Sequence, residues 1–214
     1  YPAETRKWIV VESVYSMDGD IAPLKKLVDL KNKYDAELIV DESHSGGIYG
    51  PAGQGLVFEL GLMEEIFARV ITFGKAWGNA GAVVIGSLAL KEYLVNFARP
   101  FIYSTAPSPA HVSALLSTLH YLPSKNEARQ KLQENITFFR ENIHSDAWGD
   151  SDSAIQTFFV TGNEAVRAKA AAASEFAVKP IVYPTVAKGK ERIRITLSAL
   201  HTKEQLLALI KALE

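Results

Sequence analysis

The chain has 214 residues, a net charge of −1 and no cysteine. This length can hold one large or two small domains, and the near-neutral charge gives no electrostatic reason to expect nucleic-acid or membrane binding. The lack of cysteine excludes disulfides, thiolate metal sites and a cysteine nucleophile, and no apolar run approaches the roughly 20 residues of a membrane helix. The sequence also shows no signal-peptide pattern, so we expect a cytoplasmic protein.

The first elements predict a βαβ unit. Residues 8–12 read as a buried strand, residues 24–33 carry apolar side chains at helical spacing, and residues 37–40 form a second short apolar run. Strand, helix and strand in this order favour a parallel sheet. Because buried parallel strands are usually interior to a sheet, we expect the strand at 8–12 to lack neighbours on one side.

The second strand ends in the run D-E-S-H-S-G-G (41–47). A carboxylate at the carboxyl end of a buried strand lies where open α/β sheets bind their ligands. Pyridoxal phosphate needs a lysine for its aldehyde, an acid for its pyridine nitrogen and donors for its phosphate. Asp41 can keep that nitrogen protonated, and His44 can reach the phenolic oxygen of the ring. The alternatives are a helix N-cap for Asp41 and an ordinary loop histidine for His44.

One lysine, Lys75, stands among glycines 74, 78 and 81, between apolar runs at 70–71 and 83–85. We interpret these runs as short buried strands, preceded by a glycine-rich loop at 50–55 and a short helix at 60–67. Glycine lets backbone approach a flat ligand, and a lysine amine placed there can form a Schiff base with a carbonyl. The alternative is a solvated lysine in a hairpin. Thr72, three residues earlier, can place a hydroxyl near a phosphate.

Helices are predicted at residues 88–97 and 111–122. Between them, Ser104 and Thr105 precede two prolines, so that two adjacent hydroxyls can donate to a phosphate. Turn composition at 123–126 marks the best candidate for a domain boundary. We therefore predict one domain over residues 1–123 and a second over residues 124–214.

The second domain reads as a small α/β layer with a mostly antiparallel sheet. Its predicted helices are 132–143, 163–176 and 203–213, and its predicted strands are 155–160, 178–182 and 192–197. Thr202 stands at the N-cap position of the last helix. On the last strand, Arg192 and Arg194 share one face, and an arginine fork matches a carboxylate. The alternative is a surface arginine on an edge strand.

Other chemistries lack their motifs. The sequence contains neither the G-x-S-x-G of a serine hydrolase nor a P-loop. The five histidines lack H-x-x-x-H spacing, so we expect no metal site. The remaining rival of a different class is a non-catalytic fragment or dimer-forming module.

Five blocks in order carry a resemblance to a known family. They are V-Y-S-M-D-G-D (14–20), D-E-S-H-S-G-G-I-Y-G-P-A-G-Q-G (41–55), T-F-G-K-A-W-G-N-A-G (72–81), F-I-Y-S-T-A-P-S-P (101–109) and R-I-R-I-T-L-S-A-L-H-T (192–202). The chain thereby resembles the α-oxoamine synthases over nearly its whole length. The resemblance implies an α/β fold, with part of the large domain of a fold-type I pyridoxal phosphate enzyme and a small C-terminal α/β domain. Such enzymes are homodimers that condense an amino acid with an acyl thioester and release carbon dioxide.

The resemblance also implies roles for single residues. Lys75 binds the cofactor aldehyde, Asp41 the ring nitrogen and His44 the phenolic oxygen. Ser16 contacts the cofactor near its ring, and Thr72 contacts its phosphate.

Three further residues follow from the same resemblance. It implies that Ser104 and Thr105 reach across a dimer interface into the neighbour's site, and it assigns the substrate carboxylate to Arg194. It also places Thr185, in Y-P-T-V (183–186), near the substrate. The family has a proline where Tyr183 stands, which alters the expected shape of this turn.

The run S-A-I-Q (153–156) resembles the biotin-pathway members of the family, which condense alanine with a pimeloyl thioester. Other members use glycine with acetyl or succinyl thioesters, or serine with a long acyl chain. Family members also carry a region before the first strand, which supplies a ring-stacking group and a phosphate-binding turn. We therefore expect this chain alone to self-associate, to bind the cofactor weakly or not at all, and to be inactive, whereas the parent protein is an active homodimer.

Overall fold

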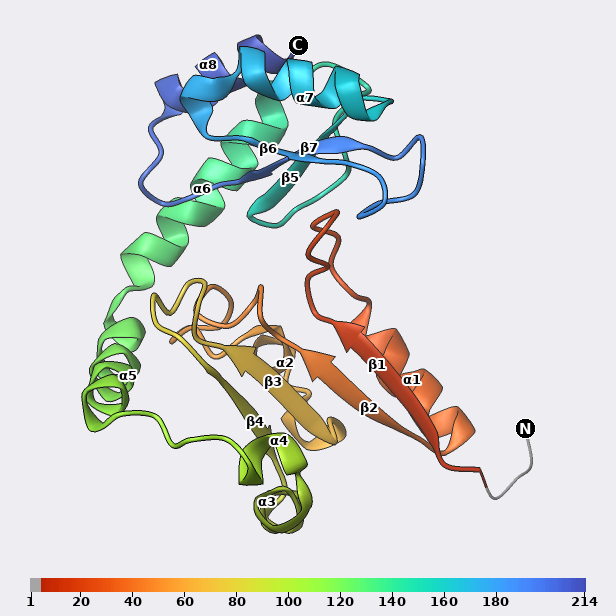
Figure 1. Cartoon of the computed structure of the whole chain (residues 1–214), viewed down its shortest axis with the longest axis vertical. Coiled ribbons are helices and arrows are strands. Elements are labelled where there is room, and N and C mark those ends of the chain that lie inside the picture. The colour runs from red at the N-terminus through yellow and green to blue at the C-terminus, as the bar shows by residue number, and fades with distance from the viewer. Residues whose placement is uncertain (1–4) are drawn as a thin grey trace. The chain divides into compact units, whose positions relative to one another are not determined.

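The computed structural model describes residues 5–214, which form two units, each with its own sheet (Figure 1). The first unit contains Ala22–Asn126 and the described residues up to Val14, and the second contains Tyr15–Ile21 and Glu127–Glu214. The main division thus lies three residues after the boundary predicted at 123/124, and Tyr15–Ile21 moves to the second unit. Residues 1–4 of the predicted first domain lie outside the described residues.

A four-stranded sheet in the order β1-β2-β3-β4 organises the first unit. Its first three strands are parallel, and β4 runs antiparallel to β3. The bounds are Lys7–Glu12 for β1, Ala36–Asp41 for β2, Ala68–Thr72 for β3 and Ala82–Gly86 for β4. Helix α1 (Leu24–Tyr34) connects β1 to β2, which confirms the predicted parallel βαβ unit.

The core of the first unit centres on β2. Leu38 and Val40 of this strand are fully buried, as expected for a strand with a parallel neighbour on each side. Helix α1 packs against β1 and β2 and buries Leu24 and Val28, whose spacing of four residues puts both side chains on one helix face.

The edge strands β1 and β4 are more exposed than the sequence predicts. Trp8 and Val10 of β1 are 45% and 67% exposed, and Val84 of β4 is 48% exposed. The prediction of two buried strands is therefore wrong at these positions, because the described residues cover these side chains only in part; the ring of Trp8, for example, meets that of Phe67 at 4.9 Å between centroids. The edge position of β1 agrees with the expected lack of neighbours on one side.

The prediction of a helix over residues 60–67 is also wrong. The chain instead forms α2 (Leu56–Glu59) and the 3-10 helix η1 (Met63–Glu65), with Gly61 between them at a φ of +70°. This backbone conformation suits glycine and ends a helix, so one continuous helix cannot form here.

The other helices of the first unit follow the predictions closely. Side-chain oxygens of Ser87 and Ser108 cap α3 (Leu88–Phe97) and α5 (Pro109–Tyr121). Helix α3 buries none of its residues within the described chain. The short α4 (Arg99–Ile102) and the 3-10 helix η2 (Leu122–Ser124) complete the unit.

The second unit has a three-stranded antiparallel sheet in the order β5-β7-β6, which confirms the predicted antiparallel layer. Its strands are β5 (Ile155–Phe159), β6 (Lys179–Ile181) and β7 (Arg192–Thr196), and its helices are α6 (Asn126–Asn142), α7 (Asn163–Ala172), the 3-10 helix η3 (Ser174–Phe176) and α8 (Lys203–Leu213). The predicted helix at 163–176 therefore breaks after Ala172. Among residues 5–214, no helix combines the length and apolar character that crossing a membrane requires.

Aromatic side chains anchor the core of the second unit. Phe139 of α6 is fully buried, and its ring meets Trp148 edge-on at 5.1 Å between centroids. Trp148 in turn meets Phe158 of β5 at 4.9 Å. Helix α8 begins with the predicted cap, because the side chain of Thr202 accepts from the amide of Gln205 in a capping box.

Polar contacts join the segment Tyr15–Ile21 to the rest of the second unit. The carbonyl of Ser16 accepts from Nε of Arg194 at 2.7 Å, the carbonyl of Gly19 accepts from Oγ of Ser151 at 2.9 Å, and Asp18 forms an ion pair with Arg192. A Cβ at Gly19 would lie 2.3 Å from the carbonyl oxygen of Ile155, so only glycine fits this position.

Candidate functional site

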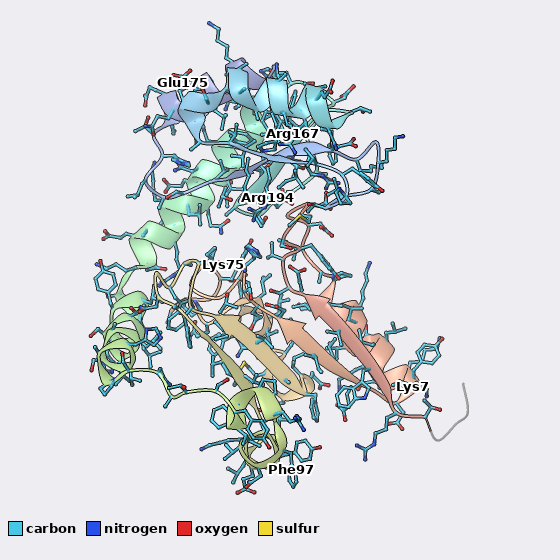
Figure 2. The ribbon with its side chains drawn as sticks, in the orientation of Figure 1. Lys7, Lys75, Phe97, Arg167, Glu175 and Arg194 are labelled. Atoms are coloured by element: carbon cyan, nitrogen blue, oxygen red, sulfur yellow. The ribbon has the colours of Figure 1, made fainter. Side chains whose placement is uncertain are left out.

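Four predicted site residues of the first unit follow the carboxyl ends of the neighbouring strands β2 and β3. Asp41 is the last residue of β2 and pairs with Val70, two residues before the end of β3 at Thr72. Lys75 lies in the hairpin loop between β3 and β4 (Figure 2). His44 lies in the turn that follows Asp41. All four residues thus lie at or just after the carboxyl ends of β2 and β3, which is where open α/β sheets bind ligands.

The carboxylate of Asp41 is held by its own turn. Oδ1 accepts a hydrogen bond from the amide of Ser43 at 2.8 Å, and the backbone carbonyl accepts from the amide of Ser13 at 2.8 Å. Among the described residues, Oδ2 accepts no hydrogen bond. Asp41 therefore caps a turn rather than a helix, and one carboxylate oxygen is available to a ligand.

Glycine allows the turn of His44 to lie against the loop of Lys75. A Cβ at Gly47 would lie 2.8 Å from Cβ of Ala76, and one at Gly46 would lie 2.9 Å from Cγ2 of Ile71. Both distances are shorter than a real contact allows, so a side chain at either glycine would push the two segments apart.

The lysine loop has a defined conformation. The amide of Gly78 donates to the carbonyl of Lys75 at 3.0 Å, and the amide of Asn79 donates to Phe73 at 2.7 Å. The side chain of Asn79 also donates to Oγ1 of Thr118 on α5 at 2.7 Å. Lys75 itself is exposed. The loop is therefore fixed at both ends while its lysine faces solvent.

Thr72 ends β3 with a buried hydroxyl. Its Oγ1 is shielded from solvent and has no hydrogen-bond partner among the described residues. A buried hydroxyl without a partner is unfavourable and indicates a missing acceptor. With the amine of Lys75 and the carboxylate of Asp41, this hydroxyl suits a cofactor that has a carbonyl, a basic ring nitrogen and a phosphate.

The structure does not bring Ser104 and Thr105 to this edge of the sheet. Both residues are exposed in the connection that follows α4. Helix α4 itself lies toward the opposite end of the parallel strands (Figure 1). The hydroxyl of Ser104 donates to the carbonyl of Pro100. Within this chain, the two residues therefore belong to a different connection from that of Lys75.

The remaining predicted site residues belong to the second unit. Arg194 lies on β7 (Figure 2). It is half-buried, and burial lowers the pKa of its guanidinium. Its Nε is bound to the carbonyl of Ser16, whereas Nη1 and Nη2 have no partner among the described residues. Arg192 differs, because its Nε donates to the carbonyl of Lys190 at 2.9 Å and Asp18 pairs with Nη1. Of these two arginines, Arg194 is the one whose Nη1 and Nη2 both remain for a carboxylate among the described residues.

Thr185 lies in an exposed turn in which its amide donates to the carbonyl of Val182 at 2.9 Å. Asn163 holds this turn, since its side chain accepts from the amide of Tyr183 at 3.0 Å and donates to the carbonyl of Tyr183 at 3.2 Å. Asn163 is not among the residues predicted from the sequence, because its place at the start of a helix gives no signal of this contact.

A buried ion pair next to the site was missed as well. Glu42 follows Asp41 directly and is fully buried, where it binds Arg69 of β3. The available signal was an arginine inside the apolar run A-R-V-I-T (68–72). Among residues 5–214, no group of three or more histidine, aspartate or glutamate side chains could hold a metal ion.

Comparison with known proteins relates this arrangement to a family. The sequence profile described as aminotransferase class I and II matches residues 2–213. The 8-amino-7-oxononanoate synthase of Cupriavidus necator is 43% identical over 218 residues, which cover 97% of this chain and 54% of that protein. The chain spans about half the length of the curated relatives it matches. The resemblance to the α-oxoamine synthases is thereby confirmed.

Solved structures agree with this assignment. A structure described as SPT with a PLP internal aldimine superposes with a TM-score of 0.88 at 29% identity, covering all of this chain and 55% of that one. The 8-amino-7-oxononanoate synthase of Francisella tularensis superposes with a TM-score of 0.84 at 30% identity, covering 98% of this chain and 62% of that one. The predicted fold class is confirmed, and the chain belongs to the aminotransferase class I and II family.

Proposed function

We propose that this chain carries the cofactor-binding residues of a pyridoxal-phosphate-dependent α-oxoamine synthase. The observation that carries the proposal is that Asp41 and Thr72 end the neighbouring strands β2 and β3, with the hydroxyl of Thr72 buried and unpartnered among the described residues and Lys75 in the loop that follows. When bound, pyridoxal phosphate withdraws electrons from an amino acid that is joined to its aldehyde carbon.

Each residue has a defined task in this proposal. Lys75 supplies the amine that holds the aldehyde carbon. Oδ2 of Asp41 accepts from the protonated ring nitrogen and keeps the proton there, because a nearby carboxylate favours the cationic form. His44 contacts the phenolic oxygen, and Thr72 donates its buried hydroxyl to the phosphate. Ser16 approaches the ring.

Substrate binding falls to residues of the second unit. Arg194 offers Nη1 and Nη2 to the carboxylate of the amino acid, in the bidentate geometry that a guanidinium favours. The bond from Nε to Ser16 orients the fork, and Thr185 lies near the substrate in a turn held by Asn163. We assign Ser104 and Thr105 to the cofactor phosphate of a second subunit, since neither residue belongs to the loops that follow β2 and β3 in this chain.

The reaction we propose is the condensation of L-alanine with a pimeloyl thioester to give 8-amino-7-oxononanoate, with release of carbon dioxide and of the free thiol of the thioester. The names of the curated relatives support this choice. A second α-oxoamine synthase reaction, with serine and a long acyl chain, is favoured by the serine palmitoyltransferase structures that superpose on the chain. Comparing turnover of alanine and serine with each thioester separates the two.

Reduction by borohydride tests the central assignment. The full-length protein is incubated with pyridoxal phosphate, reduced and digested, and the pyridoxyl label is mapped by mass spectrometry. We expect the label on Lys75 and its loss in Lys75→Arg. Lys91→Arg, which changes an exposed lysine of α3, should keep the label. A label on any other lysine of the unmodified protein would contradict the proposal.

A further inference from the structure

Glu42 and Arg69 have no task in the proposed reaction, although they form a fully buried ion pair. Glu42 is 0% exposed and Arg69 5% exposed, and Oε2 of Glu42 accepts from Nε of Arg69 at 2.5 Å. A buried ion pair contributes little stability compared with apolar side chains of similar size. Stability alone therefore does not explain why this ion pair lies beside Asp41.

One carboxylate connects three segments of the first unit. Oε1 of Glu42 accepts from the hydroxyl of Ser45 at 3.0 Å and from the amide of Val57, at the start of α2, at 2.9 Å. Arg69 brings in β3, and its Nη2 donates to the carbonyl of Gln54 at 2.5 Å. These contacts fix the turn after β2 relative to β3.

The turn fixed in this way carries two residues of the proposed site. The carbonyl of Glu42 accepts from the amides of Ser45 and Gly46, so His44 lies inside the hydrogen-bonded turn. The hydroxyl of Ser13 lies 2.8 Å from that of Ser45 and can donate to it, since the proton of Ser45 goes to Glu42, while the amide of Ser13 donates to the carbonyl of Asp41 at 2.8 Å. The network therefore reaches the backbone of Asp41 from Glu42.

The fit around Glu42 leaves little freedom. A Cβ at Gly55 would lie 2.5 Å from Oε1 of Glu42, so the carboxylate occupies space that any side chain at 55 would need. Gly55 also has a φ of +100°, which favours glycine. A glycine at position 55 therefore leaves room for the carboxylate of Glu42.

We propose that the Glu42–Arg69 pair is a positioning device for the cofactor site. It holds the carboxylate of Asp41 and the ring of His44 at a fixed position relative to the end of β3, where Thr72 and Lys75 follow. Neither charge touches the cofactor, so both are positioning residues. The part of the inference that names pyridoxal phosphate as the bound group rests on the proposed function. The part that says the pair holds the turn does not.

The test uses a charge-removing pair of substitutions. Glu42→Gln alone leaves the cation of Arg69 buried without its counter-ion, which destabilises the fold. The double variant Glu42→Leu/Arg69→Met leaves no buried charge and should melt above Glu42→Gln, although below the unmodified protein, because the amide of Val57 and the hydroxyl of Ser45 lose their acceptor. Glu59→Gln is the control, because Glu59 is an exposed carboxylate that accepts from the amide of Gly50 in the same unit.

Two readouts are needed. In the ligand-free protein, hydrogen–deuterium exchange of residues 41–47 should be at least about tenfold faster in the double variant than in the control, while α1 is unchanged. In the full-length protein, the double variant should bind pyridoxal phosphate about 10- to 100-fold more weakly, as when an outer contact to a ligand-holding residue is lost. The absorbance of the bound cofactor should also titrate at a different pH.

The proposal would be overturned if the double variant recovered its melting temperature and showed normal exchange, affinity and pH titration. The pair would then have a purely structural role. Faster exchange with unchanged affinity and titration would overturn it too. If the unmodified protein binds no pyridoxal phosphate, the proposed function fails, and exchange at 41–47 decides whether the pair holds the turn.

Discussion

Replacing Arg194 by lysine tests the substrate site through geometry rather than charge. Nε of Arg194 is used by the carbonyl of Ser16, and Nη1 and Nη2 remain for a ligand. Lysine keeps the positive charge but has one nitrogen, so it cannot bind both carboxylate oxygens and Ser16 at once. The variant Arg194→Lys therefore removes at least one charge-assisted hydrogen bond to the substrate.

The size of the effect follows from that lost bond. A hydrogen bond to a charged group contributes about 1.5–3 kcal/mol. Each 1.4 kcal/mol corresponds to about a tenfold change in affinity, so alanine should bind about 10- to 150-fold more weakly. Burial lowers the pKa of Arg194, because it removes part of the hydration of the cation, and a bound carboxylate restores a favourable partner.

The assay is a spectral titration of the cofactor-loaded full-length protein with L-alanine. Arg192→Lys is the matched control on the same strand face. The cation of Arg192 is already engaged by Asp18 and lies 4.8 Å from the ring centroid of Phe159. That variant should lose stability but change alanine affinity by less than about threefold. Equal loss of affinity in both variants, or none in Arg194→Lys, would refute the assignment.

Two further predictions address the ring nitrogen and a buried carboxylate of the second unit. Asp41→Asn should keep the fold, since an amide oxygen can still accept from Ser43, but it should lower turnover by orders of magnitude. The control Asp20→Asn should leave turnover unchanged. Near-normal turnover of Asp41→Asn would rule out the acid role. Hydrogen bonds from the amides of Gly162 and Gly189 hold the pKa of Glu191 below its ordinary value of 4.5, so the stability that its charge contributes is complete above 4.5 and is lost as the pH falls through the native pKa. Glu191→Gln should therefore lower the melting temperature at neutral pH, with a difference that shrinks in acid; a difference independent of pH would contradict this reasoning.

The sequence by itself predicted which residues of the first unit could carry the proposed chemistry. Asp41 could be placed because a short apolar run ends at a carboxylate, and Lys75 because glycines surround it between two apolar runs. These signals are local: they depend on side-chain period and on residues a few positions apart. The capping residue Thr202 was predicted for the same reason, since a cap and its helix are contiguous.

Only the tertiary structure decided which of two similar residues is available. Arg192 and Arg194 are equivalent in the sequence pattern, and their difference arises from Asp18 and from Ser16, which is 178 residues from Arg194 in the chain. Tyr15–Ile21 follows β1 directly, so nothing local indicates that it belongs to the second unit.

The burial of polar atoms was likewise a tertiary outcome. Glu42 reads as a surface charge after a strand, and its partner Arg69 is 27 residues away. The hydroxyl of Thr72 loses its solvent only when the segments around the end of β3 have packed. Pattern and period report which face a side chain takes, but the partner that compensates a buried charge or hydroxyl comes from distant segments, and only the folded chain brings them together.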